Sequence, residues 1–180
     1  MGQPRLSLTE YAVLGLLAEG AKHGFAISRD LGPDAAVGRV FTVRRPLVYR
    51  ALDRLVESGL AAPTHIERGD AGPQRVVLRV TQRGRRRLRR WLDQPVGHIR
   101  DMRIEFQLKL TLLQRSERSP VPLVSAQLET LRPTLTALED STGDRTDHVE
   151  LWRRHNAEAA ASYLEQLETL YLAERRAAHS

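Results

Sequence analysis

The clearest pattern of apolar and polar positions lies in residues 44–60, which read RRPLVYRALDRLVESGL. Apolar residues recur there at three- and four-residue steps and predict one buried helix face: Val48, Leu52, Leu55 and Val56. Pro46 suits the first helical turn, where a missing N–H costs no hydrogen bond. Gly59 suits the position just past the last turn, where a positive φ is needed. The stretch therefore predicts a short helix with defined ends.

Two helices are expected before this one. Residues 7–10, Ser-Leu-Thr-Glu, have the spacing of a capping box, which predicts a helix that runs to about Glu19. A second helix is expected over about residues 23–31, where a Gly-Pro pair ends it. Residues 34–43 are expected to form a loop, with a candidate short strand at its last three residues.

The period of the pattern changes from 3.6 to 2 after residue 60. Residues 64–68 alternate, residues 69–73 are Gly-Asp-Ala-Gly-Pro, and the alternation resumes at 75–80. In the second strand two sets of side chains are expected to face opposite ways, namely Val76, Leu78 and Val80 against Arg75, Val77 and Arg79. This pattern predicts a β-hairpin with a basic outer face.

Three helices followed by a two-stranded hairpin are typical of a winged helix-turn-helix domain. In that layout the third helix enters the major groove of DNA, and the hairpin tip lies over the flanking backbone or minor groove. Thr81 suits the cap of a fourth helix that runs to about Leu92 and carries six arginines. A Gln-Pro pair at 94–95 marks a boundary. We therefore expect a DNA-binding domain over residues 1–93.

The second half of the chain predicts three more helices. They are expected over residues 101–114, from Pro120 onward, and over about 146–176, and Pro133 is expected to kink or break the middle one. In the last helix, a stripe at mixed three- and four-residue spacing is typical of helices that pack on other helices: Val149, Trp152, Asn156, Ala160, Tyr163, Leu167 and Leu170.

Three helices bury little apolar surface by themselves, so a second copy of the chain is expected to complete their core. Six residues of the stripe are the candidate dimer contacts: Val149, Trp152, Ala160, Tyr163, Leu167 and Leu170. A two-fold dimer would also place two recognition helices about one DNA turn apart. The expected fold is mainly α with a small β-hairpin, in which residues 94–180 form a helical dimerisation domain that is also the candidate effector domain.

The positive charge of the chain is concentrated in its first half. The net charge is +6, but residues 1–92 hold 17 Lys and Arg against 8 Asp and Glu, whereas residues 93–180 hold 11 against 14. A basic half joined to a slightly acidic half indicates a nucleic-acid module followed by another domain. The alternative is a solvated surface in an arginine-biased proteome.

The predicted third helix carries the cations that most need an external anion. Arg44 and Arg45 lie at its N-terminus, the positive end of the helix dipole, and Arg50 and Arg54 lie one turn apart on an open face. We expect this face to contact the phosphates and base edges of DNA. Tyr49 is expected either to reach DNA or to pack across the first two helices.

The arginines of the fourth helix and the aromatic residues near the junction of the two halves each allow two interpretations. The arginines of the fourth helix either touch phosphates beside the wing or form a solvated face. Trp91, Phe106 and Trp152 are either core residues or, together with His155, the lining of an effector pocket where the two halves meet. For Arg75, which follows a Gly-Pro tip, a contact with the DNA backbone or minor groove is favoured.

The chain offers little for catalysis. It has no cysteine, which excludes disulfides, zinc–thiolate sites and thiol nucleophiles. Its six histidines are scattered, and no Gly-rich phosphate loop, HExxH motif or nucleophile elbow occurs. We expect no catalytic residue, metal or cofactor. No apolar run is long enough to cross a bilayer and no signal-peptide core follows the first residues, so a cytoplasmic protein is expected.

Several segments, in order, resemble the PadR family of bacterial transcriptional regulators. The segments that carry the likeness are YAVLGLL at 11–17, HGFAI at 23–27, RPLVYRALDRL at 45–55, GL at 59–60, GPQR at 72–75, VT at 80–81 with Gly84, WL at 91–92 with Pro95, and RIEFQLKL at 103–110. The length of the second half is similar to that of the longer-tailed members, whose C-terminal helices form the dimer.

The resemblance implies a homodimeric winged helix-turn-helix repressor, which commonly silences a neighbouring gene until a small molecule binds. By position it places two sets of residues, Arg45, Leu47, Tyr49, Arg50 and Arg54 on the recognition helix and Gly72 and Arg75 on the wing. The chain departs from many members at Arg44-Arg45-Pro46, where they have Ser-Pro-Gly, and at Val77-Leu78, where they have paired tyrosines.

Our leading hypothesis is a dimeric repressor that binds double-stranded operator DNA and is released by a small aromatic or hydrophobic effector. A regulatory adaptor that uses its winged domain to bind protein is the alternative, because a fold alone does not determine function. The uneven charge argues against the adaptor. A small hydrolase or metal enzyme is a third hypothesis, and it would need a metal held by the scattered histidines.

Overall fold

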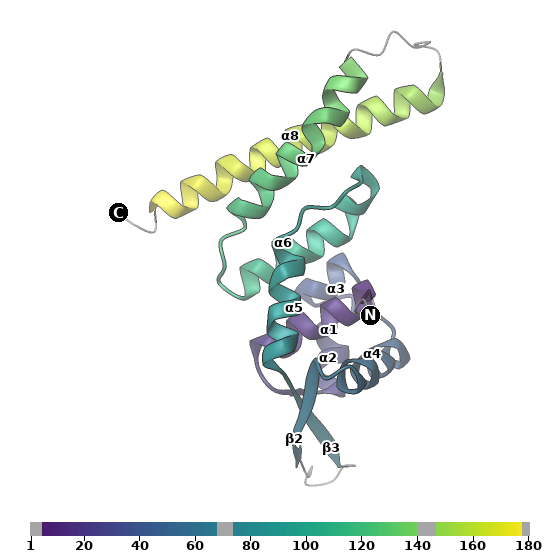
Figure 1. Cartoon of the computed structure of the whole chain (residues 1–180), viewed down its shortest axis with the longest axis vertical. Coiled ribbons are helices and arrows are strands. Elements are labelled where there is room, and N and C mark those ends of the chain that lie inside the picture. The colour runs from purple at the N-terminus through teal and green to yellow at the C-terminus, as the bar shows by residue number, and fades with distance from the viewer. Residues whose placement is uncertain (1–4, 68–73, 140–146, 178–180) are drawn as a thin grey trace. The chain divides into compact units, whose positions relative to one another are not determined.

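The computed structural model describes residues 5–67, 74–139 and 147–177 (Figure 1). The chain divides into two compact units. Unit 1 consists of residues 1–91 and 107–117, and unit 2 of residues 92–106 and 118–180. Helices predominate, with a small three-stranded antiparallel sheet in unit 1, which confirms the predicted fold class. The domain division at residues 93 and 94 stays a prediction.

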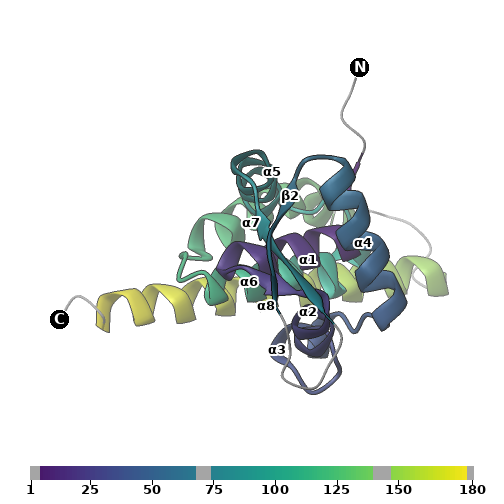
Figure 2. The ribbon, with the colours of Figure 1, turned by 90° about the horizontal axis from the view of Figure 1, so that it is seen from below.

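Unit 1 begins with four helices and contains the sheet. In chain order its elements are α1 (Leu8–Glu19), β1 (Lys22–His23), α2 (Gly24–Asp30), α3 (Ala36–Val40), α4 (Arg45–Glu57), β2 (Ala61–Glu67), β3 (Arg75–Val80), α5 (Gln82–Leu92) and most of α6 (Glu105–Arg115). The helix α1 packs against α4 and β3 at the centre of the unit (Figure 2). The strands β2 and β3 extend away from the helices as a ribbon (Figure 1).

The predicted capping box starts α1. The Ser7 N–H and hydroxyl donate to the Glu10 carboxylate at 2.6 and 2.7 Å, and the Glu10 N–H donates to the Ser7 hydroxyl oxygen at 3.3 Å. Every residue from Tyr11 to Leu17 is buried, so α1 is enclosed on all sides rather than along one stripe. The helix α6 can pack closely on α1 because Gly15 has no side chain. A Cβ at position 15 would lie 2.6 Å from the Leu112 side chain of α6.

The helix α4 has the ends that the sequence predicts. Pro46 lies in its first turn, and Gly59 follows its end with a φ of 68°. Val48, Leu52 and Leu55 are buried as expected, but Val56 is exposed, which corrects its assignment to the buried face. Its place there is taken by Ala51, which also lies on the inner side of the helix.

The expected loop and strand before α4 are wrong, because residues 36–40 form α3 and residues 41–43 form no strand. Val37 is fully buried and anchors this short helix. The chain then returns to α2 through a hydrogen bond from the Val43 N–H to the Leu31 carbonyl at 3.1 Å. Burial of one valine is a tertiary effect that hydrophobic periodicity over five residues does not reveal.

The sheet contains one strand that the sequence pattern does not predict. Its order is β1-β3-β2, and β1 pairs with β3 at Lys22 with Leu78 and at His23 with Val77. Val77 is therefore buried, whereas Val76 lies beyond the end of β1 and is exposed. This corrects the expected alternation, in which Val76 faced inward and Val77 outward. A register shift in β2 between Pro63 and His65 also interrupts the simple period of two.

The predicted cap of α5 is confirmed, because the Gly84 N–H donates to the Thr81 hydroxyl oxygen at 3.1 Å. Leu88, Trp91 and Leu92 are buried. The Trp91 ring stacks on Tyr11 with centroids 4.2 Å apart and planes 7° apart. On the same indole, the buried Lys109 of α6 places its Nζ 4.9 Å from the ring centroid. This stack joins α1, α5 and α6 within unit 1.

An ion pair also fastens α6 to α1. The Arg115 guanidinium donates to both Glu19 carboxylate oxygens, at 2.6 and 2.7 Å, and Lys22 donates to the same carboxylate at 3.0 Å. Burial alone would raise the pKa of Glu19, but the hydrogen bonds from Arg115 and Lys22 outweigh it and lower that pKa from 4.5.

Because the folded pKa of Glu19 is lowered, its charge stabilises the fold above pH 4.5, and this contribution is lost as the pH falls through the folded value. We expect Glu19→Gln to lower the free energy of unfolding at pH 7 by about 1 kcal/mol, since water screens a partly exposed pair. The difference from wild type should shrink below pH 4.5. Urea titrations at pH 7 and pH 3.5 measure it. An equal difference at both pH values would contradict the charge effect.

Unit 2 is built on two long helices. Its elements are η1 (Ile99–Arg103, a 3-10 helix), α7 (Val121–Glu139) and α8 (His148–Ala177). The helices α7 and α8 lie side by side (Figure 1), and the Ser125 hydroxyl donates to the Glu168 carboxylate between them. The amide of the buried Gln127 exchanges two hydrogen bonds with the backbone of Val96, at 2.7 and 3.0 Å.

Pro133 lies inside α7 and does not end it, so of the two expected effects, a kink or a break, the break is wrong. A proline inside a helix removes one backbone hydrogen bond and strains the preceding turn. Packing along α8, with Leu131 buried two residues earlier, offsets this cost and keeps the helix continuous.

Candidate nucleic-acid interface

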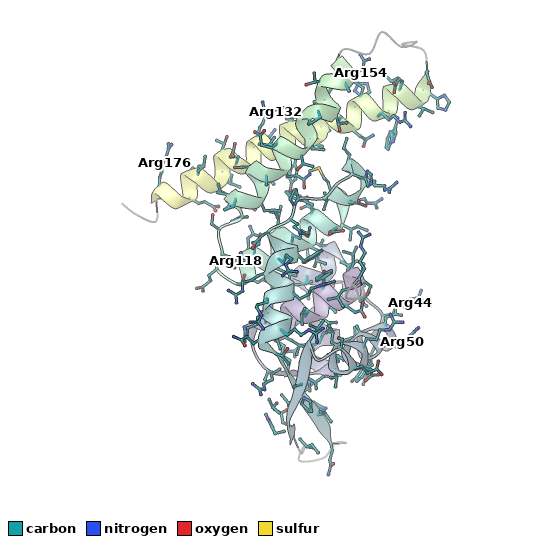
Figure 3. All side chains as sticks on the ribbon, viewed as in Figure 1. Arg44, Arg50, Arg118, Arg132, Arg154 and Arg176 are labelled. Atoms are coloured by element: carbon teal, nitrogen blue, oxygen red, sulfur yellow. The ribbon has the colours of Figure 1, made fainter. Side chains whose placement is uncertain are left out.

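The buried side of α4 directs its other side to solvent. Val48, Ala51, Leu52 and Leu55 face the interior of unit 1. The remaining side chains of the helix are exposed: Arg45, Pro46, Leu47, Tyr49, Arg50, Asp53, Arg54, Val56 and Glu57. Figure 3 shows Arg44 and Arg50 at the outer edge of the unit. We call this exposed side of α4 the outer face, and it has two edges with different neighbours.

The first edge faces the wing, which is the ribbon formed by β2 and β3, across a groove of about 790 Å³. Apolar residues from α4 and the two long strands line its floor: Leu52, Val56, Pro63, Val76 and Leu78. Arg45 and Tyr49 border it from α4, Arg75 from the first position of β3, and Phe25 from α2. The groove therefore has an apolar floor with two guanidinium groups and two aromatic rings around it.

The second edge faces the start of α1. Leu47, Arg50 and Arg54 line a smaller groove of about 230 Å³ with Ser7 and Glu10. The Arg54 Nη1 lies 3.9 Å from Glu10 Oε1, and Arg54 remains 61% exposed. Glu10 already accepts from Ser7, so its charge is shared and the guanidinium keeps free donors for another anion. The predicted DNA-binding residues of α4 thus fall on both edges of the outer face.

Acidic residues limit where an anion fits on the outer face. Asp53 and Glu57 both line the wing-side groove in the second half of α4, and sequence reasoning assigned them no role. Carboxylates repel phosphate, so on the wing-side edge the favourable region for DNA backbone is the first half of the helix. Carboxylates also accept hydrogen bonds from the amino group of cytosine, which makes Asp53 a candidate for base contact.

Tyr49 packs against α2 and against an arginine. A Cβ on Gly24 would lie 2.8 Å from Tyr49 Cε1, so glycine is needed for this close approach. The Arg45 guanidinium lies 5.6 Å from the Tyr49 ring centroid. Of the two roles considered for Tyr49, packing against the start of the second helix is present, and its partly exposed ring still borders the groove.

The wing contributes Arg75, which is exposed at the start of β3. The predicted contact residue Gly72 lies outside the described residues. Phe25 was not predicted as a site residue, yet its ring lies beside both Arg45 and Arg75. In the sequence Phe25 appeared only as part of the HGFAI segment at 23–27, and the structure shows it exposed on α2 between the buried Gly24 and Ile27.

One arginine of α5 bonds to the backbone of α1, and others are exposed to solvent. The Arg85 guanidinium donates to the Ala18 carbonyl at 3.1 Å, near the C-terminal end of α1, where a cation is favourable. Four others are exposed on α5: Arg83, Arg86, Arg89 and Arg90. Their contact with DNA stays open.

The predicted effector residues lie in different environments. Trp91 belongs to the stack in unit 1, and Phe106 is fully buried. Trp152 and His155 lie on α8 with most of their side chains in solvent, 69% of Trp152 being exposed. None of the four lines either groove beside α4. Their role in effector binding stays a prediction.

The predicted dimer residues all lie on α8. Val149, Trp152 and Leu170 are exposed, and Ala160, Tyr163 and Leu167 are partly buried. Leu151 and Leu172 add to the exposed apolar surface of the helix. Within residues 5–67, 74–139 and 147–177, no three histidine or carboxylate side chains come together as a metal site. No described helix is both long and apolar enough to cross a membrane.

Comparison with known proteins identifies one matching family. Residues 13–90 match the sequence profile described as the transcriptional regulator PadR-like family. This segment runs from α1 to α5 and includes α4 and the strands of the wing. A comparison with curated proteins finds no match.

Three solved structures are similar to the chain. Bacillus subtilis PadR in complex with operator DNA is 20% identical, with a TM-score of 0.48, over 92% of this chain and 99% of that one. The protein smu.1604c from Streptococcus mutans UA159 is 15% identical (TM-score 0.43; 93% and 98% covered). The PadR-like transcriptional regulator BC1756 from Bacillus cereus is 16% identical (TM-score 0.41; 92% and 99% covered).

Proposed function

Residues 13–90 match the PadR-like family of transcriptional regulators, and from this match we propose that the chain is a sequence-specific DNA-binding repressor of that family. It works as a homodimer in the cytoplasm and leaves its operator when a small aromatic or hydrophobic effector binds. It uses no cofactor and catalyses no reaction. The observation that carries the proposal is the arrangement of arginines on both edges of the outer face and on the wing.

These arginines are available to an external anion. Among the described residues, no carboxylate oxygen lies within 4.0 Å of the guanidinium groups of Arg44, Arg45, Arg50 or Arg75. Pairing with phosphate releases condensed counterions from DNA, which makes such unpaired cations effective there. Arginine also binds guanine through two hydrogen bonds, so the same helix suits base recognition in the major groove.

The proposed function is tested by selecting duplexes from a random pool with the full chain, then measuring affinity by fluorescence anisotropy. We expect an enriched palindrome whose half-sites lie about one helical turn apart, and binding that resists competition by random duplex. Affinity should fall steeply with salt, by about 0.9 in log–log slope for each phosphate contact. Failure to enrich any sequence would refute specific DNA binding and favour the adaptor.

The homodimer is supported by the apolar surface of α8. Five large apolar side chains on this helix are exposed: Val149, Leu151, Trp152, Leu170 and Leu172. They form one group near the start of α8 and one near its end, and exposed apolar side chains that gather in this way mark candidate interaction surfaces. A second copy of α8 is the proposed partner, because a two-fold axis presents the same apolar residues from both sides.

We expect Leu170→Glu to weaken the dimer at least tenfold. Burying a leucine contributes about 1.5–3 kcal/mol, and a carboxylate placed in the interface adds a desolvation cost. Thr169→Glu introduces the same charge at the neighbouring exposed position and serves as the matched control. Sedimentation equilibrium measures both dissociation constants. If the two variants dissociate equally, the apolar surface around Leu170 is not the interface.

A further inference from the structure

Phe25 lies between two arginines that come from different parts of the chain. It is the second residue of α2, and 45% of its surface is exposed. The Arg45 Cζ, at the start of α4, lies 5.5 Å from its ring centroid, and the Arg75 Cζ, at the start of β3, lies 5.3 Å from it. Both distances are within the range of a cation–π contact.

We propose that Phe25 is the positioning residue of a two-arginine clamp, in which Arg45 from the recognition helix and Arg75 from the wing bind one stretch of DNA backbone. The proposal rests on the proposed DNA-binding function. It assigns to Phe25 a role in joining the two DNA-contacting elements, and it identifies the groove mouth between α4 and the wing as the place where phosphate binds.

An aromatic ring holds a guanidinium without neutralising it. A carboxylate partner would cancel the positive charge and occupy the N–H donors, whereas a ring face leaves the donors at the guanidinium edge free. In the described part of the chain, no carboxylate oxygen lies within 4.0 Å of Arg45 or Arg75. Phe25 therefore orders both cations and leaves their charge available to phosphate.

The acidic residues of the groove restrict where its arginines can attract phosphate. Asp53 and Glu57 line the same groove as Arg45 and Arg75. Arg45 begins α4, and at about 1.5 Å per residue Asp53 lies about 12 Å further along the helix, so phosphate is attracted most strongly where Phe25 holds the two arginines, away from the carboxylates. Tyr49, whose ring centroid is 5.6 Å from the Arg45 Cζ, lies beside Arg45, and among the described aromatic rings only Phe25 lies beside both arginines.

The test compares Phe25→Leu, which keeps an apolar side chain but has no ring, with Phe25→Tyr, which keeps the ring. Affinity of the full chain for its selected duplex is measured by anisotropy from 50 to 300 mM salt. We expect Phe25→Leu to bind about five- to thirtyfold more weakly, as two exposed cation–π contacts predict. Its log–log salt slope should fall by about one to two units, because up to two phosphate contacts are loosened. Phe25→Tyr should bind like wild type.

A double-mutant cycle separates positioning from direct contact. If Phe25 acts only through the two arginines, Phe25→Leu has no further effect in a chain that carries Arg45→Ala and Arg75→Ala. Phe25 is half exposed, so all variants should melt within a few degrees of wild type by circular dichroism. Comparison of these melting temperatures distinguishes a folding defect from a binding defect.

Each outcome bears on the proposal. Unchanged affinity and slope in Phe25→Leu overturn it, as does an equal loss in Phe25→Tyr. A loss that persists in the Arg45→Ala, Arg75→Ala background overturns it in favour of direct contact between Phe25 and DNA. These outcomes leave the proposed function standing, since wild type still binds. A wild-type chain that binds no duplex overturns both.

Discussion

A chain that carries Arg50→Ala and Arg54→Ala is expected to lose operator binding while it remains folded and dimeric. Both guanidinium groups are exposed on the α1 side of the outer face, so their loss leaves no cavity in unit 1. The Arg54–Glu10 contact at 3.9 Å is a long surface pair and contributes little stability. Each arginine that contacts a base or phosphate contributes about 1–3 kcal/mol, so we expect at least a thirtyfold loss of affinity.

The matched control is Arg132→Ala with Arg153→Ala, which removes the same charge from exposed positions in unit 2. Both double variants change the net charge equally, so a general electrostatic effect would weaken both. Anisotropy titrations at one salt concentration measure the difference, and sedimentation checks the dimer. If the Arg50, Arg54 variant binds as tightly as the control, these residues do not form the DNA contact.

Trp91→Ala is expected to give the largest loss of stability, about 3–5 kcal/mol in the free energy of unfolding. The ring fills a buried position, stacks on Tyr11 at 4.2 Å and carries the Lys109 ammonium 4.9 Å from its centroid. Its removal leaves a cavity between α1 and α5 and takes the ring face from a buried cation. A loss of this size is comparable to the whole stability of a marginal domain.

Trp91→Phe is the control for this variant. It keeps a ring in the stack while it removes volume and the indole N–H, so we expect it to cost less than half as much as alanine. Urea unfolding followed by far-UV circular dichroism measures both. A Trp91→Ala chain that unfolds within 1 kcal/mol of wild type would show that the stack is not a structural element, and it would favour a ligand role for Trp91.

Local chemistry made α4 predictable. Pro46 in its first turn and Gly59 past its end act within a few residues, and three of the four predicted inner residues are buried. The capping box of α1 and the Thr81 cap of α5 are local for the same reason. Where the interaction that forms an element spans only three or four residues, the sequence pattern carries the information.

Elements that depend on distant partners were not predictable. The two-residue strand β1 exists because Leu78 and Val77 pair with it more than fifty residues later in the chain. That pairing buries Val77 and leaves Val76 outside, against the alternation. The helix α7 passes through Pro133 because α8 packs along it. No window of ten residues contains these partners.

The candidate site shows the same division. The arginines of α4 were predictable from charge and helical spacing, but their separation onto two edges depends on where α1 and the wing lie. The role of Phe25 requires Arg45 and Arg75 to meet at one ring, across 20 and 50 positions of sequence. The sequence pattern does not show that Asp53 and Glu57 line the same groove as Arg45 and Arg75, because this depends on where the wing lies.

The central claim is that DNA binds to α4 and the wing, and amide hydrogen exchange tests it most directly. Exchange is measured on the full chain with and without its selected duplex, at a salt concentration where the complex is saturated. We predict that the duplex slows exchange in residues 45–57 and 75–80 and leaves residues 148–177 unchanged. Protection confined to residues 148–177, with none in α4 or β3, would contradict the account.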